Sequence, residues 1–213
     1  MDQSAVAMAI DWNGDIQGER GPALLLMQRA EHPTDPWSGQ VSLPGGRAEL
    51  VDNDLLATAT REAREELNID LEVSARHLGQ LPPRQAMARG AYVNLWITPH
   101  IFEVRKAMAP SPSDEAQDFF WLPLGPVRRG ELDHKFTYRR PGSKSDLILP
   151  GLKYEERVIW GLTYRMLLSL FEHTTESCFH KAATDQWLID RFNSGDYRGL
   201  LEAALILNTL HQL

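Results

Sequence analysis

Two apolar stretches near the start of the chain have the length and composition of β-strands. Residues 4–10 and 22–29 are rich in aliphatic side chains, and the segment between them carries Asn-Gly, Gly-Asp and Arg-Gly pairs, which are turn signals. Apolar, aromatic and β-branched residues also predict strands at 77–81, 91–104 and 116–124, and the second of these fits one long strand or two short ones.

Other segments have the three-to-four-residue spacing of helices. An early helix is predicted to end at about Leu67 and to start at Asn53 or Asp54, either of which can serve as its N-cap. Its apolar positions are Leu55, Leu56, Ala59, Ala63 and Leu67. A second helix is expected at 155–172, whereas 125–150 has no clear pattern.

The end of the chain adds two more helical patterns, at 184–193 and 198–211. We therefore expect a domain at 1–174 and a helical extension at 175–213, which can cap the core, form a homodimer interface or bind a partner. An apolar stripe in this extension must be buried somewhere; it consists of Leu200, Leu201, Ala204, Leu205 and Leu207. Strands that alternate with helices predict a layered α/β or α+β fold.

Composition narrows the class of protein. With 213 residues, 43% hydrophobic and 24% charged, the chain has the make-up of a water-soluble globular protein. Its net charge of -7 argues against a nucleic-acid-binding surface, which needs a basic patch. No apolar run reaches the roughly 20 residues that span a membrane. The single cysteine, Cys178, and the absence of a signal-peptide pattern predict a cytoplasmic location.

The stretch REAREEL at 61–67 raises the main chemical question. Glu62, Glu65 and Glu66 project from one side of a helix, where like charges repel one another. In isolation the stretch fits a mixed-charge surface helix. However, the Gly-Gly pair at 45–46 precedes it and allows close approach of a ligand, and carboxylate oxygens suit Mg²⁺ or Mn²⁺.

Residues 43–69, LPGGRAELVDNDLLATATREAREELNI, resemble the Nudix box, the loop–helix–loop signature of Nudix hydrolases. The second half matches closely. In the first half, Gly46 and Arg61 are one residue farther apart than usual, and Asp52 stands where a glutamate is expected. Asn68 replaces the closing glycine and is the next most tolerant residue for a left-handed helix end. The resemblance implies a mixed sheet between helices.

Further segments are similar to the coenzyme A pyrophosphatase branch of this superfamily. They are the upstream motif at 24–46, with Arg29, Gly39 and Gln40, and the segments at 114–124 and 159–167. The motif's second arginine is absent, and Thr34 occupies the nearest position. In all, the resemblance covers about residues 4–172.

The resemblance implies roles for individual residues. The metal ligands for Mg²⁺ or Mn²⁺ would be Glu62, Glu65, Glu66 and Asp52. The catalytic residues would be Glu65, Glu66, Arg61 and Glu115, and the substrate-binding residues Arg29, Gln40, Gly45 and Gly46. Alternatives stay open: Asp52 as a helix cap, Glu115 as a solvated loop carboxylate, and Arg29 as a surface residue.

The resemblance also implies the reaction. We expect metal-dependent hydrolysis of the diphosphate linkage in a small nucleoside-diphosphate derivative, with coenzyme A or acyl-coenzyme A as the leading substrate. ADP-ribose, NADH and dinucleotide polyphosphates are the alternatives within the same chemistry. A Nudix-fold binding or regulatory protein without turnover is the alternative from another class.

Overall fold

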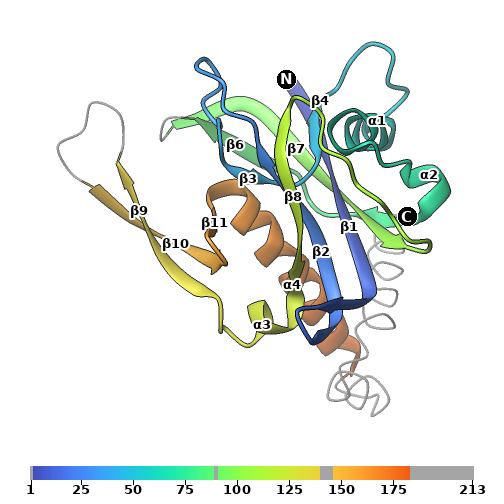
Figure 1. Ribbon diagram of the computed structural model, residues 1–213, viewed down its shortest axis with the longest axis vertical. Helices are drawn as coiled ribbons and strands as arrows, with labels where there is room; N and C mark the ends of the chain where they lie inside the picture. Colours follow the sequence, from blue (N-terminus) through green and yellow to red (C-terminus); the bar gives the residue numbers. More distant parts are fainter. Residues whose placement is uncertain (1, 89–90, 140–145, 183–213) are drawn as a thin grey trace.

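An eight-stranded mixed sheet forms the centre of the protein in the computed structural model, which describes residues 2–88, 91–139 and 146–182 (Figure 1). The strands follow the order β3-β2-β1-β7-β5, and three more strands pair at its sides: β4 with β1, β6 with β7, and β8 with β2. Their bounds are β1 Asp2–Ile16, β2 Glu19–Arg29, β3 Val41–Ser42, β4 Gly45–Arg47, β5 Ala75–Gln80, β6 Arg84–Ala88, β7 Ala91–Val104 and β8 Ala116–Pro123. The pairing of β1 with β7 is parallel, and the other pairings are antiparallel.

Strand β1 lies in the interior of the sheet and is buried on both faces. Successive side chains of a strand point to opposite faces, so the continuous apolar run of β1 supplies two different surfaces. One consists of Val6, Met8 and Ile10, and the other of Ala5, Ala7 and Ala9. The second surface is made of small side chains, which let a neighbouring helix approach closely.

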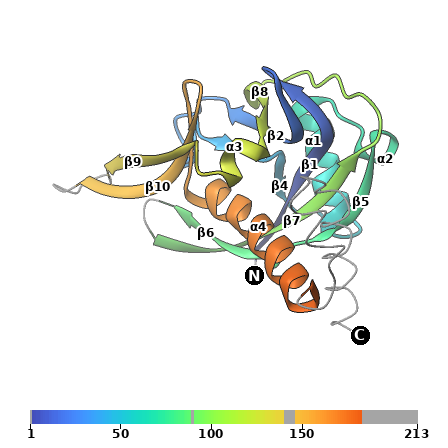
Figure 2. The ribbon, with the colours of Figure 1, turned by 90° about the horizontal axis from the view of Figure 1, so that it is seen from below.

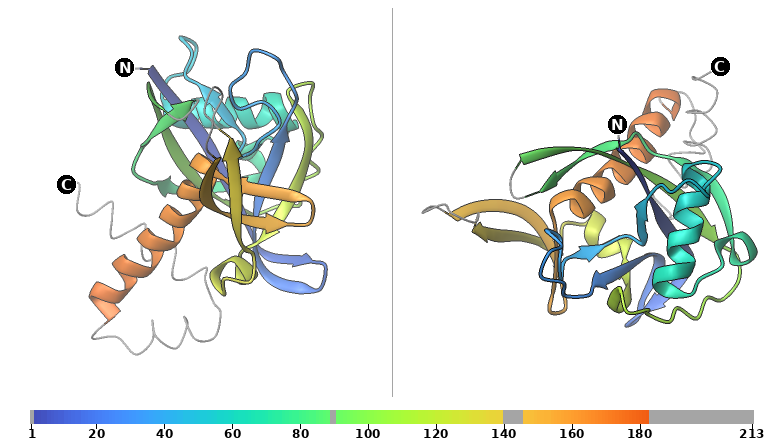
Figure 3. Two further views of the ribbon diagram at one scale, coloured as in Figure 1. Left: turned by 90° about the vertical axis from the view of Figure 1, so that its left-hand side faces the viewer. Right: turned by 90° about the horizontal axis from the view of Figure 1, so that it is seen from above.

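A helix covers each face of this sheet (Figures 2 and 3). Helix α1, Leu55–Leu67, packs Ala59 and Ala63 into the core on the alanine face. Helix α4, Gly161–Ala182, packs Met166, Leu167 and Leu170 into the core on the opposite face. The expected mixed sheet between helices is therefore confirmed.

A second, three-stranded sheet stands beside the first, in the order β11-β10-β9. Strand β9 is Asp133–Arg139, β10 is Asp146–Tyr154 and β11 is Arg157–Trp160. We call the β9–β10 hairpin the arm, because it projects away from the body of the protein (Figure 1). The sequence pattern gave no prediction for this region.

The expected helix at 155–172 is wrong at its start. Residues 157–160 are a strand, and the helix begins only at Gly161. Glu155 takes the left-handed conformation (φ 53°) in the tight turn between β10 and β11, and Gly161 (φ 63°) separates β11 from the helix. Glutamate is not a typical turn residue, and the alternation in β11 is too short to stand out from a helical pattern.

Two short helices were also not predicted: α2, Leu71–Ser74, and α3, Leu124–Arg128. The predicted boundary between residues 174 and 175 falls within α4, and the helical patterns at 184–193 and 198–211 lie outside the described residues. Among the described helices, none combines the length and the hydrophobicity needed to cross a bilayer.

Candidate active site

The Gly-Gly loop is held against both the sheet and helix α1. Strand β4 pairs with β1, so that Gly45 lies opposite Val6 and Gly46 opposite Ala5. A Cβ atom on Gly45 would come within 2.3 Å of the Ala5 carbonyl oxygen, and one on Gly46 within 2.3 Å of Oε1 of Glu62. A side chain at position 45 would clash with the backbone of β1, and one at position 46 would clash with the Glu62 carboxylate.

Glu66 is the most deeply buried carboxylate of the site, with a side chain only 2% exposed. The Gly45 N–H donates to Oε2 of Glu66 at 2.7 Å, and Nη1 of Arg29 lies 3.9 Å from Oε1. Burial raises the pKa of Glu66 to about 8; the Gly45 hydrogen bond opposes this, and the nearby charge of Glu62 adds to it. A bound cation would stabilise the charged form of a carboxylate that is buried with so little positive charge nearby.

Arg61 connects the other carboxylates. It donates to both oxygens of Asp52, at 2.9 and 3.0 Å, to Glu62 at 3.0 Å and to Glu65 at 2.8 Å. These partners hold the pKa of Arg61 above its usual value, with the Asp52 hydrogen bond as the largest cause. Arg61 therefore ties Glu62 and Glu65 to Asp52.

Asp52 is an anchor for Arg61. Its side chain is 4% exposed and also accepts hydrogen bonds from the Thr58 hydroxyl and the Glu49 N–H. These bonds, with that from Arg61 the strongest, lower the pKa of Asp52 to about 2. The alternative of Asp52 as helix cap is wrong, because Asp54 caps α1 by accepting from the Ala57 N–H. At the other end of α1, Asn68 takes the left-handed conformation, as predicted.

The 29–40 loop brings Arg29 to the edge of the carboxylates. Asp35 accepts from Nε and Nη2 of Arg29 at 3.1 and 2.7 Å, which leaves Nη1 facing Glu66. The Gln40 carbonyl accepts from the Arg29 N–H, but the Gln40 side chain reaches Pro36 within its own loop. Trp37 donates its indole N–H to the Met87 carbonyl, which ties this loop to β6.

Glu115 lies in an exposed loop that is fastened to the end of α1. The Ser113 N–H donates to the Glu66 carbonyl, and the Ser111 N–H to that of Leu67. Burial raises the pKa of Glu62, and the charge of Glu115 adds to this shift and to that of Glu66. The structure thus brings Glu115 near the two buried glutamates.

The charge of the carboxylates suits a divalent cation. Within the described ranges, no group of three or more His, Cys, Asp or Glu side chains is already arranged to hold a metal ion. Arg61 and the Gly45 N–H engage oxygens of Glu62, Glu65 and Glu66. Arg61, which is shared with Asp52, and Arg29, which is shared with Asp35, cannot neutralise three glutamates, two of which are buried. Hard oxygen ligands with excess negative charge are the environment that Mg²⁺ and Mn²⁺ prefer.

Comparison with known proteins agrees with this geometry. The family model for the NUDIX domain matches residues 4–140. The chain belongs to the Nudix hydrolase family. It is 32% identical to the uncharacterized Nudix hydrolase NudL of Yersinia pestis and of Yersinia pseudotuberculosis over 156 residues, which are 72% of this chain and 73% of each relative.

Solved structures agree with the fold. A Nudix hydrolase from M. smegmatis, RenU, has a TM-score of 0.52 at 15% identity and covers 82% of this chain and 86% of its own. A MutT/nudix family protein from Enterococcus faecalis has a TM-score of 0.50 at 14% identity and covers 83% of this chain and 63% of its own. The family model and the 32% identical relatives identify the protein as a Nudix hydrolase, a pyrophosphohydrolase that acts on nucleoside-diphosphate derivatives. Enzymes of this family generally use divalent metal ions.

Two supporting residues were missed in the sequence. Asp35 holds Arg29, and Thr58 donates to Asp52. The pattern carries a signal for the second, because Thr58 lies one helical turn before Arg61 and Glu62 on α1 and on the same side as them. The pairing of Asp35 with Arg29 depends on a loop conformation that spacing alone does not reveal.

Proposed function

We propose that the protein hydrolyses the diphosphate linkage of coenzyme A or an acyl-coenzyme A, with Mg²⁺ or Mn²⁺ held by Glu62, Glu65 and Glu66. The observation that carries the metal site is the burial of Glu62 and Glu66 beside the Gly-Gly loop, with too little positive charge to neutralise them. A divalent cation there would supply positive charge to the phosphoryl oxygens and promote the ionisation of water.

The residues of the chain would divide the remaining work. Asp52 and Arg61 hold Glu62 and Glu65 in position through charge-assisted hydrogen bonds. Arg29 presents Nη1 toward Glu66, from where it can bind a phosphate oxygen of the substrate. Glu115 would accept a proton from the attacking water. Because the oxygens of Asp52 are already occupied, the geometry favours its role as an anchor over that of a metal ligand.

The choice of coenzyme A rests on the likeness of residues 24–46 to the coenzyme A pyrophosphatase motif. In the structure this segment forms strand β2, the loop that carries Arg29 and Asp35, and the Gly-Gly loop, so the motif lies around the carboxylates. ADP-ribose, NADH and dinucleotide polyphosphates are the competing substrates, since they contain the same linkage.

The test is a rate comparison with the full chain and Mg²⁺ across coenzyme A, acetyl-coenzyme A, ADP-ribose, NADH and diadenosine polyphosphates. We expect the highest kcat/KM for a coenzyme A compound, with 4′-phosphopantetheine (or its acyl form) and adenosine 3′,5′-bisphosphate as products. A higher kcat/KM for another member of the panel would overturn the coenzyme A assignment. Turnover by Glu66→Gln at the wild-type rate would overturn the site.

A further inference from the structure

Among the described residues, the strand at the outer edge of the arm pairs with a neighbour on one side only. In the three-stranded sheet, β10 lies between β11 and β9, so that β9 has one strand partner among the described residues. The Lys153 N–H donates to the Leu132 carbonyl, which sets the alternation of hydrogen bonds along this pair. The backbone groups of His134, Phe136 and Tyr138 therefore face β10, whereas those of Asp133, Lys135, Thr137 and Arg139 face outward. Pro150, which has no N–H to donate, lies opposite the outward-facing Lys135, as this alternation requires.

The arm has little support of its own. Strand β11 pairs with β10 only from Gly151 to Tyr154, so the outer part of the arm is a two-stranded ribbon. Such ribbons are marginally stable in water without further packing. The side chains of Leu147 and Ile148 are 38% and 70% exposed there. This suggests that the arm is covered in the working protein.

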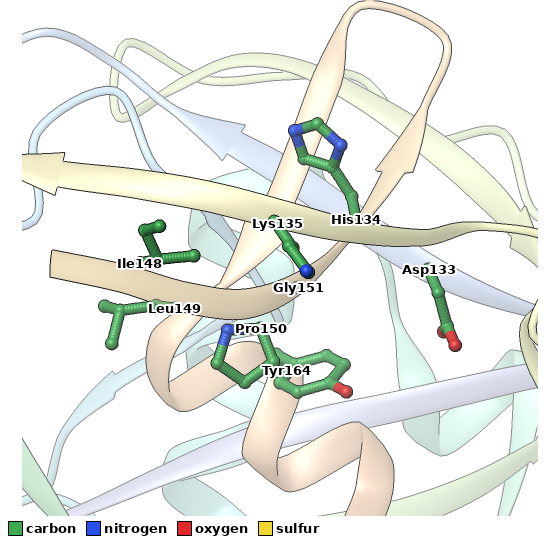
Figure 4. A pocket seen from close by; sticks show the side chains of 8 residues that line it. All are labelled: Asp133, His134, Lys135, Ile148, Leu149, Pro150, Gly151 and Tyr164. Carbon is green, nitrogen blue, oxygen red and sulfur yellow. The ribbon is translucent and has the colours of Figure 1, made fainter.

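The underside of the arm is also separated from α4. A cavity of about 440 Å³ lies between β9, β10 and the helix (Figure 4). Lys135, Pro150 and Tyr164 lie around it, with Asp133 at one end. The other face carries an aromatic cluster: the ring of Trp160 lies 4.5 Å from that of Phe136 and 5.1 Å from that of Tyr138.

We propose that β9 pairs antiparallel with β9 of a second copy of this chain, about a two-fold axis at Phe136. This register places outward-facing residues opposite one another, as strand pairing requires. Asp133 then faces Arg139 of the partner subunit, and Lys135 faces Thr137 of the partner subunit. The two Phe136 rings meet on the aromatic face, where cross-strand aromatic pairs are favourable.

Charge selects this register. A shift of β9 in one direction places Lys135 opposite its own copy, and a shift in the other places it opposite the second copy's Arg139. The first shift opposes two lysines, which is unfavourable, and the second opposes Lys135 to Arg139, whose charge is offset in part by its ion pair with Asp146. Charged residues on an edge strand normally hinder association; here they hinder the wrong registers and permit one symmetric arrangement. Seven residues bury less than the roughly 800 Å² per partner of a typical stable interface, so the dimer should be reversible.

The first test is sedimentation velocity over a range of concentrations with the full chain, Thr137→Pro and Thr137→Val. Proline removes an N–H that faces outward, and it is tolerated at a free edge, whereas valine keeps the N–H. We expect the wild type and Thr137→Val to dimerise equally, and Thr137→Pro to need at least a tenfold higher concentration. A wild type that stays monomeric throughout, or a dimer that Thr137→Pro leaves unchanged, would overturn the proposal.

The second test checks the register by disulfide trapping in a Cys178→Ser background. On the two-fold axis, Phe136→Cys opposes its own copy at a separation that suits a disulfide, so mild oxidation should give a covalent dimer. Thr137→Cys is the matched control and should give several-fold less, because its opposite residue is Lys135. Equal yields from the two variants would refute this register. Neither test depends on which substrate the enzyme cleaves.

Discussion

The carboxylate site and the arm differ in how completely their residues are held. At the site, the single side chain of Arg61 donates to Asp52, Glu62 and Glu65, and the Gly45 N–H donates to Glu66. In the arm, β9 has one neighbouring strand among the described residues and Ile148 is largely exposed. The site is held by many hydrogen bonds but carries buried carboxylates that need a cation. The arm has no buried carboxylate cluster, but its outer part lacks packing. Each region is thus incomplete in a different way, and each predicts a different kind of partner.

The largest effect is expected from Glu66→Gln. Loss of the charge should lower kcat by on the order of 10²–10³, because electrostatic stabilisation of the transition state depends on the metal site. In metal-free protein at neutral pH the melting temperature should stay close to that of the wild type, since the raised pKa of Glu66, about 8, already keeps its buried side chain mostly neutral. Kinetics and thermal melts of the same preparation check both expectations. A fall in melting temperature together with full activity would mean that Glu66 is only structural.

The two glycines should separate stability from function. Gly45→Ala brings a Cβ against the Ala5 carbonyl at a φ of 153°, so we expect it to destabilise the fold by roughly 2–4 kcal/mol. In Gly46→Ala the atoms nearest to the new Cβ belong to the Glu62 carboxylate. We therefore expect a clear loss of kcat and a smaller loss of stability than in Gly45→Ala. Urea unfolding and initial rates of both variants give the comparison. Equal losses of stability would show that the Gly-Gly loop is one structural unit.

Acid should destabilise the fold through a buried pair of histidines. His100 is 3% exposed, its Nδ1 lies 3.2 Å from Nε2 of His77, and both lie near Asp54 at the start of α1. Burial, and then the charge of His77, lower the pKa of His100 to about 4. As the pH falls, this histidine therefore binds a proton in the unfolded chain before it does so in the folded protein. Stability should therefore be full above about pH 6.5 and fall between there and pH 4, by on the order of 2 kcal/mol.

The matched variant for this effect is His100→Phe, which removes the titrating group and keeps an aromatic ring. Its free energy of unfolding, measured from pH 7 to pH 4, should change less than that of the wild type. An unchanged pH dependence would assign the acid sensitivity to other groups.

The smallest effect should come from the arm. Phe136→Ala removes the stacking on Trp160, and neither of these two residues belongs to the main core. We expect the global stability of the monomer to change by about 1 kcal/mol or less. Backbone amides of β9 and β10 should exchange hydrogen faster than those of β1, and the variant should increase this difference. A loss of several kcal/mol would mean that the arm is part of the main folding unit.

Local patterns in the sequence predicted the parts of the protein that depend on neighbours along the chain. The strands near 4–10, 22–29 and 116–124 and helix α1 up to Leu67 were recovered, because continuous apolar runs and helical spacing reflect burial directly. Glu62, Glu65 and Glu66 share one side of a single helix, so their proximity follows from helix geometry.

Only the tertiary structure decided what depends on residues far apart in the chain. Gly45 reaches Glu66, Arg29 approaches the same glutamate, and Glu115 joins them through the end of α1. The arm and β11 escaped prediction because β9 and β10 are half exposed, β11 has only four residues, and a Glu-Glu turn joins β11 to β10. Spacing along the chain indicates which side chains share one face of a helix or strand. Separate segments are brought together by the packing of alanines between β1 and α1, and that packing exists only in the folded protein.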